Sequence, residues 1–145
     1  MHSGIAAKIK RQNHLISELN SVYHNAALKL GLSDSSMQVI YTICDFGDSC
    51  LLSDICYLTR LSKQTINSAL RRLERDGWIR LEPETSKSKR VFLTESGKSL
   101  ADKTALRMMD AENAVFASWT SEDVNRYFEL TQRFIRLIKE KIKDF

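Results

Sequence analysis

The sequence predicts a mainly α-helical protein that contains a helix-turn-helix followed by one β-hairpin. The chain has 145 residues, and one proline and five glycines are the few residues that would interrupt its long stretches of helical periodicity. In residues 63–76, apolar side chains recur at the three- and four-residue spacing of one helix face. Two short runs follow at 78–82 and 89–93, and the polar loop between them indicates a hairpin.

The N-terminal part is expected to form two helices that each end at a glycine. The first covers about residues 2–30 and carries a loose apolar stripe. Gly31 ends it, because glycine readily adopts the left-handed conformation that stops a helix. Ser33 is a good N-cap for the second helix, at about 34–46, and Gly47 ends that helix.

The helix-turn-helix is expected at 52–76, with a tight turn at 60–62. The core-facing stripe of its second helix consists of Ile66, Ala69, Leu70 and Leu73. The opposite side contains amide, hydroxyl and guanidinium groups but no carboxylate, and consists of Gln64, Asn67, Ser68, Arg71 and Arg75. A solvated helix face usually mixes both signs of charge. This face is therefore typical of a recognition helix in a DNA major groove.

The distribution of charge supports a polyanionic partner. Nine basic and four acidic residues lie between positions 60 and 94, which gives this segment a net charge of +5 in a chain whose total is +4. All of the excess positive charge therefore lies in the helix-turn-helix and the hairpin. Such clustering is the electrostatic signature of phosphate binding.

Two long helices are expected to close the chain, at about 94–118 and from Ser121 onward, with Thr94 and Thr120 as N-caps. The last helix carries a strong apolar stripe, formed by Val124, Tyr127, Phe128, Thr131, Phe134, Ile135 and Ile138. A helix of over twenty residues is longer than about 30 Å, which a small helix-turn-helix core cannot cover. Pairing two chains through these helices would cover the stripe and place two recognition helices about 34–36 Å apart over a palindromic site.

Several other classes of protein are disfavoured by the sequence. No apolar run approaches the roughly 18 residues that span a bilayer, and no secretion signal precedes the first helix. We therefore expect a cytoplasmic protein with reduced thiols. No cofactor, metal or enzymatic activity is expected, because there is no glycine-rich phosphate loop, no nucleophile–base arrangement and no shared ligand spacing among His2, His14 and His24.

Three motifs then identify a family resemblance. They are Leu-Ser-x-x-Thr-Ile at 61–66, Leu-Glu-Arg-Asp-Gly-Trp-Ile at 73–79, and Val-Phe-Leu-Thr-Glu-Ser-Gly at 91–97. The stretch 52–100 resembles the MarR family of winged helix-turn-helix transcription regulators, and the flanking helices agree in length and order.

The chain departs from the family's pattern at several positions. The wing has Thr85 and Lys87 where the family usually has an Asp-x-Arg pair, Arg60 lies where glycine is common, Leu51 lies where a threonine cap is common, and Cys56 takes a small-residue position.

The resemblance implies the arrangement of the whole chain. It implies a single winged helix-turn-helix domain over 1–145, with a DNA-binding lobe at 33–97 and dimerisation helices at 1–32 and 98–145. The implied function is a homodimeric repressor that reads a palindromic operator in double-stranded DNA, with helix 63–76 in the major groove and the 83–90 wing at the minor groove.

The candidate DNA contacts fall into three groups, and a merely solvated helix face is the alternative for all of them. The residues placed for base edges are Gln64, Asn67, Ser68 and Arg71. Those placed for phosphates are Ser62, Lys63, Thr65, Arg72 and Arg75, and those of the wing are Lys87, Lys89 and Arg90.

Regulation and two alternative functions remain open at this point. Relatives often bind small aromatic acids, so the resemblance implies such an effector here. The crevice that it implies would be lined by His24, Tyr41, Phe46, Met108, Met109 and Phe116. At helical spacing, such residues are more often part of the hydrophobic core. A thiol-based redox-sensing regulator would use Cys44, Cys50 or Cys56, although their apolar settings favour inert core thiols. The altered wing also leaves open a winged-helix protein-interaction module without specific DNA binding.

Overall fold

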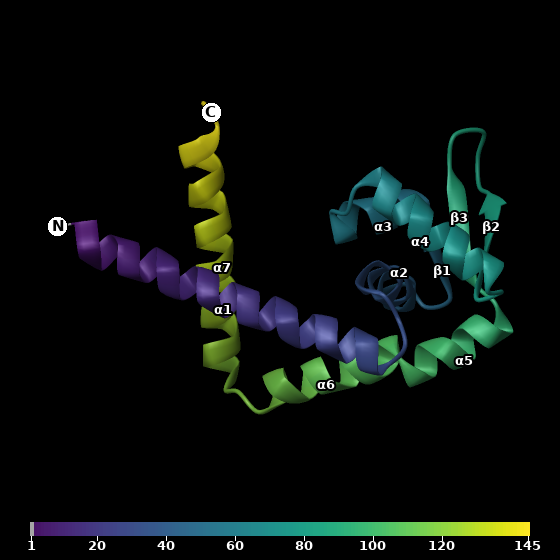
Figure 1. Cartoon of the computed structure of the whole chain (residues 1–145), viewed down its shortest axis with the longest axis horizontal. Coiled ribbons are helices and arrows are strands. Elements are labelled where there is room, and N and C mark those ends of the chain that lie inside the picture. The colour runs from purple at the N-terminus through teal and green to yellow at the C-terminus, as the bar shows by residue number, and fades with distance from the viewer. Residues whose placement is uncertain (1) are drawn as a thin grey trace. The chain divides into compact units, whose positions relative to one another are not determined.

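The computed structural model of the chain describes residues 2–145, without the side chains of residues 2, 3 and 5. Two compact units are present, Met1–Arg107 and Met108–Phe145. The first unit has the order helix, helix, strand, two helices, two strands, helix (Figure 1). Its elements are α1 (His2–Lys29), α2 (Asp34–Asp45), β1 (Ser49–Leu51), α3 (Leu52–Thr59), α4 (Lys63–Arg75), β2 (Ile79–Pro83), β3 (Lys89–Leu93) and α5 (Glu95–Lys103).

The second unit consists of the end of α6 (Ala105–Ala117) and all of α7 (Ser121–Ile142). The aromatic rings of Phe116, Trp119 and Tyr127 pack edge to face or tilted against one another at the α6–α7 corner, with centroids 5.3–6.1 Å apart. No described helix is long and apolar enough to cross a membrane.

The mainly α-helical fold with a small β wing is confirmed, with one strand more than the sequence predicted. The antiparallel sheet has the order β1-β3-β2, so that Cys50 pairs with Val91 from one side and Leu81 pairs with Val91 from the other. Because β1 has three residues, it is too short to show an alternating pattern in the sequence. Its pairing exists only once β3 lies beside it.

The core of the first unit joins the helices to this sheet. Its most buried side chains are branched aliphatic residues that α2, α3, α4 and β3 contribute. Those with at most 1% of their surface exposed include Val39, Ile40, Ile43, Ile55, Ile66, Leu73 and Val91. The core-facing stripe predicted for the recognition helix is confirmed, since Ile66, Ala69, Leu70 and Leu73 are all buried. Burial of an aliphatic side chain of this size contributes about 1.5–3 kcal/mol to folding.

The predicted helix caps are confirmed by their hydrogen bonds. The Ser33, Thr94 and Thr120 side chains accept backbone N–H bonds from residues three positions further along, as capping side chains do. Gly31 has the left-handed φ of +82° that ends α1. Leu51 provides no side-chain cap, yet α3 still begins directly after it, because β1 fixes the chain at that point.

The helix expected at 94–118 is divided into α5 and α6 at Thr104. This residue has φ −127° and ψ −88°, is buried, and donates a hydrogen bond from its hydroxyl to the Leu100 carbonyl at 2.8 Å. A threonine that bonds to the carbonyl four residues back tends to bend a helix. No glycine or proline marks the break, so the sequence pattern alone predicted one continuous helix.

The start of α5 is fixed against the turn that follows α4. The hydroxyls of Thr94 and Ser96 both donate to the Gly77 carbonyl, at 2.6 and 2.8 Å. A Cβ atom at Gly97 would overlap the carbonyl of Trp78. The Leu-Thr-x-x-Gly sequence therefore places a capping threonine and a residue without a side chain where helix and turn meet.

Candidate nucleic-acid interface

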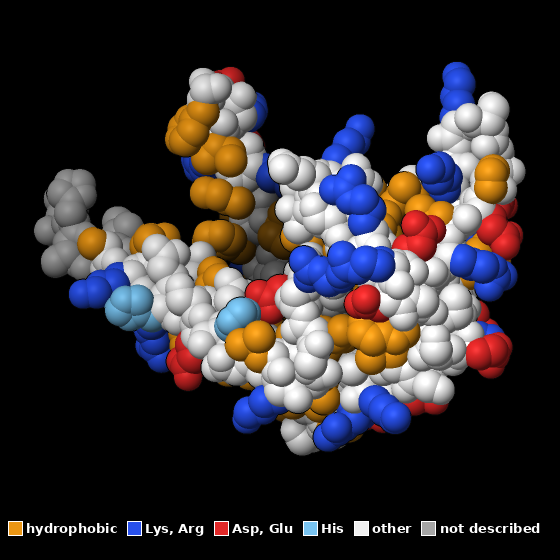
Figure 2. All heavy atoms as spheres, turned by 45° about the vertical axis from the view of Figure 1, so that its right-hand side comes forward, with side chains coloured by type: hydrophobic (Ala, Val, Ile, Leu, Met, Phe, Trp, Pro, Cys, Tyr) orange, Lys and Arg blue, Asp and Glu red, His pale blue; other side chains and the backbone are white. Residues whose placement is uncertain are grey.

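The recognition helix α4 presents the predicted polar face to solvent. Gln64, Asn67, Ser68 and Arg71 are exposed, and so is Arg75. Figure 2 shows Lys and Arg side chains over this part of the lobe and at the end of the wing. The buried stripe on the other side of α4 keeps the helix from rotating about its axis, so the orientation of this face is fixed by the core.

The N-terminus of α4 is organised by hydroxyl groups. The Ser62 hydroxyl accepts the Thr65 N–H at 3.1 Å, and the two hydroxyls lie 2.8 Å apart. Both side chains were predicted as phosphate ligands, but in this structure their first role is to cap the helix. Lys63, between them, is exposed and extends from the first turn.

Two of the arginines predicted for phosphates are already engaged. The Arg72 guanidinium donates to the Ser33 hydroxyl at 3.1 Å, which ties α4 to the N-cap of α2. Arg75 lies 3.8 Å from the Asp76 carboxylate and forms an exposed ion pair with it. An exposed pair of this kind contributes little to stability, at most about 1 kcal/mol.

The wing has an ion pair of its own, although it lacks the Asp-x-Arg pair that is usual in the family. The Arg90 Nε donates to the Glu84 carboxylate at 2.9 Å, and a terminal nitrogen donates to the Ser49 hydroxyl at 3.3 Å. The Glu84 hydrogen bond raises the pKa of Arg90 further above its ordinary value. Arg90, which the sequence analysis predicts as a DNA contact, therefore also joins the wing to Ser49 of β1.

The tip of the wing is shaped by hydroxyl groups rather than by an acid–arginine pair. The Thr85 and Ser88 hydroxyls lie 2.7 Å apart, and Thr85 accepts the Lys87 N–H at 3.2 Å. The Lys87 and Lys89 side chains are exposed. The chain thus keeps a compact wing with a lysine near its end, although Thr85 and Lys87 replace the Asp-x-Arg pair.

Comparisons with known proteins agree with this geometry. The family model described as "MarR family" matches residues 30–90, from the end of α1 through the wing. This part of the chain therefore resembles the MarR family. Its members are transcription regulators rather than enzymes.

The similarity to known proteins extends over most of the chain. The chain is 25% identical over 131 residues to the HTH-type transcriptional regulator YwoH of Bacillus subtilis strain 168, covering 85% of this chain and 95% of that protein. It is 27% identical over 93 residues to the homoprotocatechuate degradative operon repressor of Escherichia coli, which covers 63% of each chain. The fold is similar to that of NMB1585, a MarR family regulator from Neisseria meningitidis, with a TM-score of 0.82, 20% identity, and coverage of 94% of this chain and 97% of the other.

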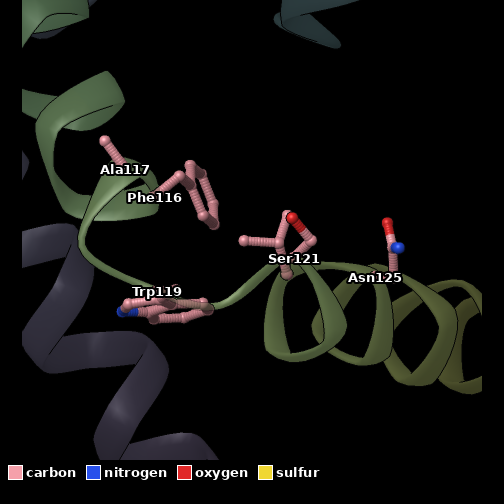
Figure 3. Close-up of a pocket in the computed structure, with 6 residues that line it drawn as sticks. Phe116, Ala117, Trp119, Ser121 and Asn125 are labelled. Carbon is pink, nitrogen blue, oxygen red and sulfur yellow. The ribbon is translucent and has the colours of Figure 1, made fainter.

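One of the predicted effector residues lies at a hollow of the second unit. The hollow has a volume of about 450 Å³, and Figure 3 shows the aromatic rings of Phe116 and Trp119 with Ser121 and Asn125 at its wall. The full lining is Phe116, Ala117, Trp119, Ser121, Val124 and Asn125. Of the six predicted residues, only Phe116 lines this hollow. His24 instead contacts the Asp34 carboxylate at 2.9 Å, which links α1 to the start of α2.

The cysteines have the properties of core residues. Burial raises the pKa of the Cys44 thiol to about 11, with the Asp45 charge adding to the effect. Burial likewise raises the pKa of the Cys50 thiol to about 11, and Asp54 adds to it. Cys56 is half-buried and packs against the core. Among the described residues, no three His, Cys, Asp or Glu side chains are grouped as a metal site would need.

Proposed function

We propose that this protein is a homodimeric repressor of the MarR family that reads a palindromic operator, with helix 63–76 in the major groove and the 83–90 wing at the minor groove. The observation that carries the proposal is the two-sided character of α4. Its apolar stripe is buried in the core, and its exposed face bears amides, hydroxyls and guanidinium groups without a carboxylate. Amides suit adenine and arginine suits guanine in the major groove.

The proposed contacts divide by chemistry. Gln64, Asn67, Ser68 and Arg71 read base edges, while Lys63, Lys87 and Lys89 contact phosphates without reading sequence. Ser62, Thr65, Arg72, Arg75 and Arg90 are also proposed to contact phosphates or the minor groove, and in the single chain they form the hydrogen bonds and ion pairs described above.

Dimerisation is proposed to occur through segments 1–32 and 98–145. The support is the apolar stripe of α7, whose Tyr127, Phe128, Phe134, Ile135 and Ile138 are each between 42% and 46% exposed in the single chain. A contiguous exposed apolar stripe marks an interaction surface, and a second, symmetry-related copy of the chain is the commonest kind of partner. Repression is supported by the resemblance to an operon repressor.

The decisive experiment is selection of bound duplexes from random DNA by the purified protein, followed by titration of the selected site at several salt concentrations. We expect an inverted repeat with half-sites about 10 base pairs apart, and an affinity that falls steeply with salt. If the selected duplexes share no common sequence and their affinity does not depend on salt, a winged-helix protein-interaction module is favoured instead.

An aromatic acid effector is proposed as the regulator of this binding. The support is the aromatic hollow at Phe116, which has two polar side chains, Ser121 and Asn125, at its wall. The two DNA-binding lobes of the proposed dimer must be spaced to match the two half-sites. An effector that binds more tightly to a conformation with a different spacing would shift the population toward that conformation and so release the DNA. Titration of small aromatic acids against the operator complex tests this, and unchanged operator affinity throughout the series would remove its support.

A further inference from the structure

One residue of the helix-turn-helix has an unusual backbone conformation. Arg60, the C-cap of α3, has φ 57° and ψ 16°, and it is the only non-glycine residue with a positive φ in the part of the chain that the structure describes. The left-handed region is strained for a residue with a side chain, and glycine adopts it freely. A non-glycine residue held there points to a role for its side chain.

The side chain of Arg60 is held in place without a counter-charge. Its guanidinium carbon lies 4.3 Å from the centre of the Tyr57 ring, and that tyrosine is 64% exposed. None of the ion pairs among the described residues includes Arg60, whereas Arg75, Arg80 and Arg90 each pair with an acid. A cation stacked on an aromatic ring keeps its hydrogen-bond donors free along the edge of the guanidinium plane.

The position of Arg60 places this cation beside the proposed DNA surface. It lies two residues before Ser62, the N-cap of α4, so the two Cα atoms are at most about 7.6 Å apart. The N-terminal part of a recognition helix is the part that enters the groove, and the phosphates of the groove edge flank it. The net charge of this region is positive, which favours such an approach.

We propose that Arg60, held over the Tyr57 ring, binds a phosphate of the DNA backbone at the edge of the groove that α4 enters. This inference rests on the proposed DNA-binding function. The planar guanidinium donates two parallel N–H bonds to the phosphate oxygens. Because the stack on Tyr57 restricts the side chain before DNA arrives, less conformational entropy is lost on binding.

The test is Arg60→Gly, for which the inference predicts opposite effects on folding and on DNA binding. The melting temperature rises by about 3 °C, because glycine relieves the left-handed strain. The log–log slope of operator affinity against salt becomes shallower by about 0.9 per subunit. For a dimer that difference amounts to an affinity about 60-fold lower than the parent's at 0.1 M salt, if the two proteins bind equally at 1 M.

Three further variants separate charge from backbone effects. Arg60→Asn tolerates the left-handed conformation and removes the charge, so it also gives the shallower slope. Arg60→Lys keeps the charge and retains the parental slope. Lys103→Gln removes one exposed positive charge from α5, away from the recognition helix, and leaves the slope unchanged.

The outcomes distinguish this inference from the function on which it rests. If the parent protein binds its selected operator with a steep salt dependence and Arg60→Gly has the same slope, Arg60 does not contact phosphate. If Arg60→Gly makes the slope shallower but Arg60→Asn keeps the parental slope, the change in the backbone is responsible and the inference is again overturned. If the parent shows no salt-dependent duplex binding, the proposed function itself fails.

Discussion

Helices α4 and α7 have the same kind of amphipathic sequence but very different surroundings. The apolar residues of α4 are at most 4% exposed, because α2 and β2 pack against this helix. Apart from the half-buried Val124, the large apolar residues along α7 are 42–46% exposed, and none of its residues is buried. A helical stripe of apolar residues therefore indicates that something covers it, but it does not indicate whether the cover comes from the same chain.

Truncating the stripe of α4 should have the largest effect on folding. Leu73→Ala leaves a cavity in the core and should lower the free energy of unfolding by about 2–5 kcal/mol. Denaturant unfolding measures this, and the loss should not depend on protein concentration. The exposed Ser68→Ala is the matched control, with a change within about 0.5 kcal/mol. A loss below about 1 kcal/mol for Leu73→Ala would contradict the description of this core.

A charge placed in the stripe of α7 should act on association instead. Ile135→Asp should weaken the proposed dimer by about 3 kcal/mol, roughly 100-fold, because an uncompensated carboxylate would be buried in the interface. Sedimentation over a range of concentrations measures the change, and the helical circular dichroism of the first unit should remain. Gln132→Asp, an exposed position on the same helix, should leave association unchanged. An equal effect of both variants would argue against an interface at this stripe.

On the outer face of α4, Arg71→Ala should weaken specific DNA binding by about 1–3 kcal/mol and relax the preference at one base pair. The guanidinium is exposed, and none of the ion pairs of the described residues includes it, so the loss should appear in affinity rather than in folding. Competition with operator duplexes that carry single base-pair changes measures this. If binding to all of these duplexes were weakened equally, Arg71 would contact the phosphate backbone of the DNA rather than a base.

At the wing, Lys87→Ala should have a smaller and less selective effect. Loss of one phosphate contact per subunit should make the salt slope shallower by about 0.9 per subunit and weaken all duplexes similarly. Salt titrations with operator and unrelated duplexes measure this. A change confined to the operator would mean that Lys87 reads sequence.

The smallest effect is expected at the buried thiols. With a pKa of about 11, roughly one thiol in a thousand is ionised at pH 8 in Cys44 and Cys50, about 100-fold fewer than at the unperturbed pKa of 9.0. Alkylation of the folded protein should be slower than alkylation in urea by about this factor. Fast alkylation that also releases DNA would support the thiol-sensing alternative.

The same thiols give the direction of a pH effect. Folding raises their pKa, so the unfolded chain loses these protons first as the pH rises. The stabilisation is complete below about pH 9 and is lost between about pH 9 and 11. Unfolding experiments at pH 8 and pH 10 should therefore give a lower free energy of unfolding at the higher pH.

Local features of the fold were predictable, and features that depend on distant contacts were not. The caps at Ser33, Thr94 and Thr120 depend on side chains three residues from their partners. The buried face of α4 depends on helical periodicity. By contrast, β1 forms only because β3 lies beside it, and the division at Thr104 depends on the burial of one hydroxyl.

The candidate site shows the same division between local and distant contacts. The exposed polar face of α4 was visible in the sequence, because the face opposite a buried stripe must lie outside. The hydrogen bond between Arg72 and Ser33 joins residues 39 positions apart, and no pattern in the sequence indicated it. The hairpin register alone does not give the Arg90–Glu84 pair, because it places Glu82 opposite Arg90, and Glu82 pairs with Arg80 instead.

By itself, the sequence determined the helices, their caps, the direction of the α4 faces and the concentration of positive charge between residues 60 and 94, because periodicity, capping and composition act over a few residues. The tertiary structure decided which basic side chains form ion pairs. It also decided that the helix expected at 94–118 divides at Thr104 and that Arg60 adopts a left-handed conformation over the Tyr57 ring. Those outcomes depend on which atoms meet once distant segments pack together.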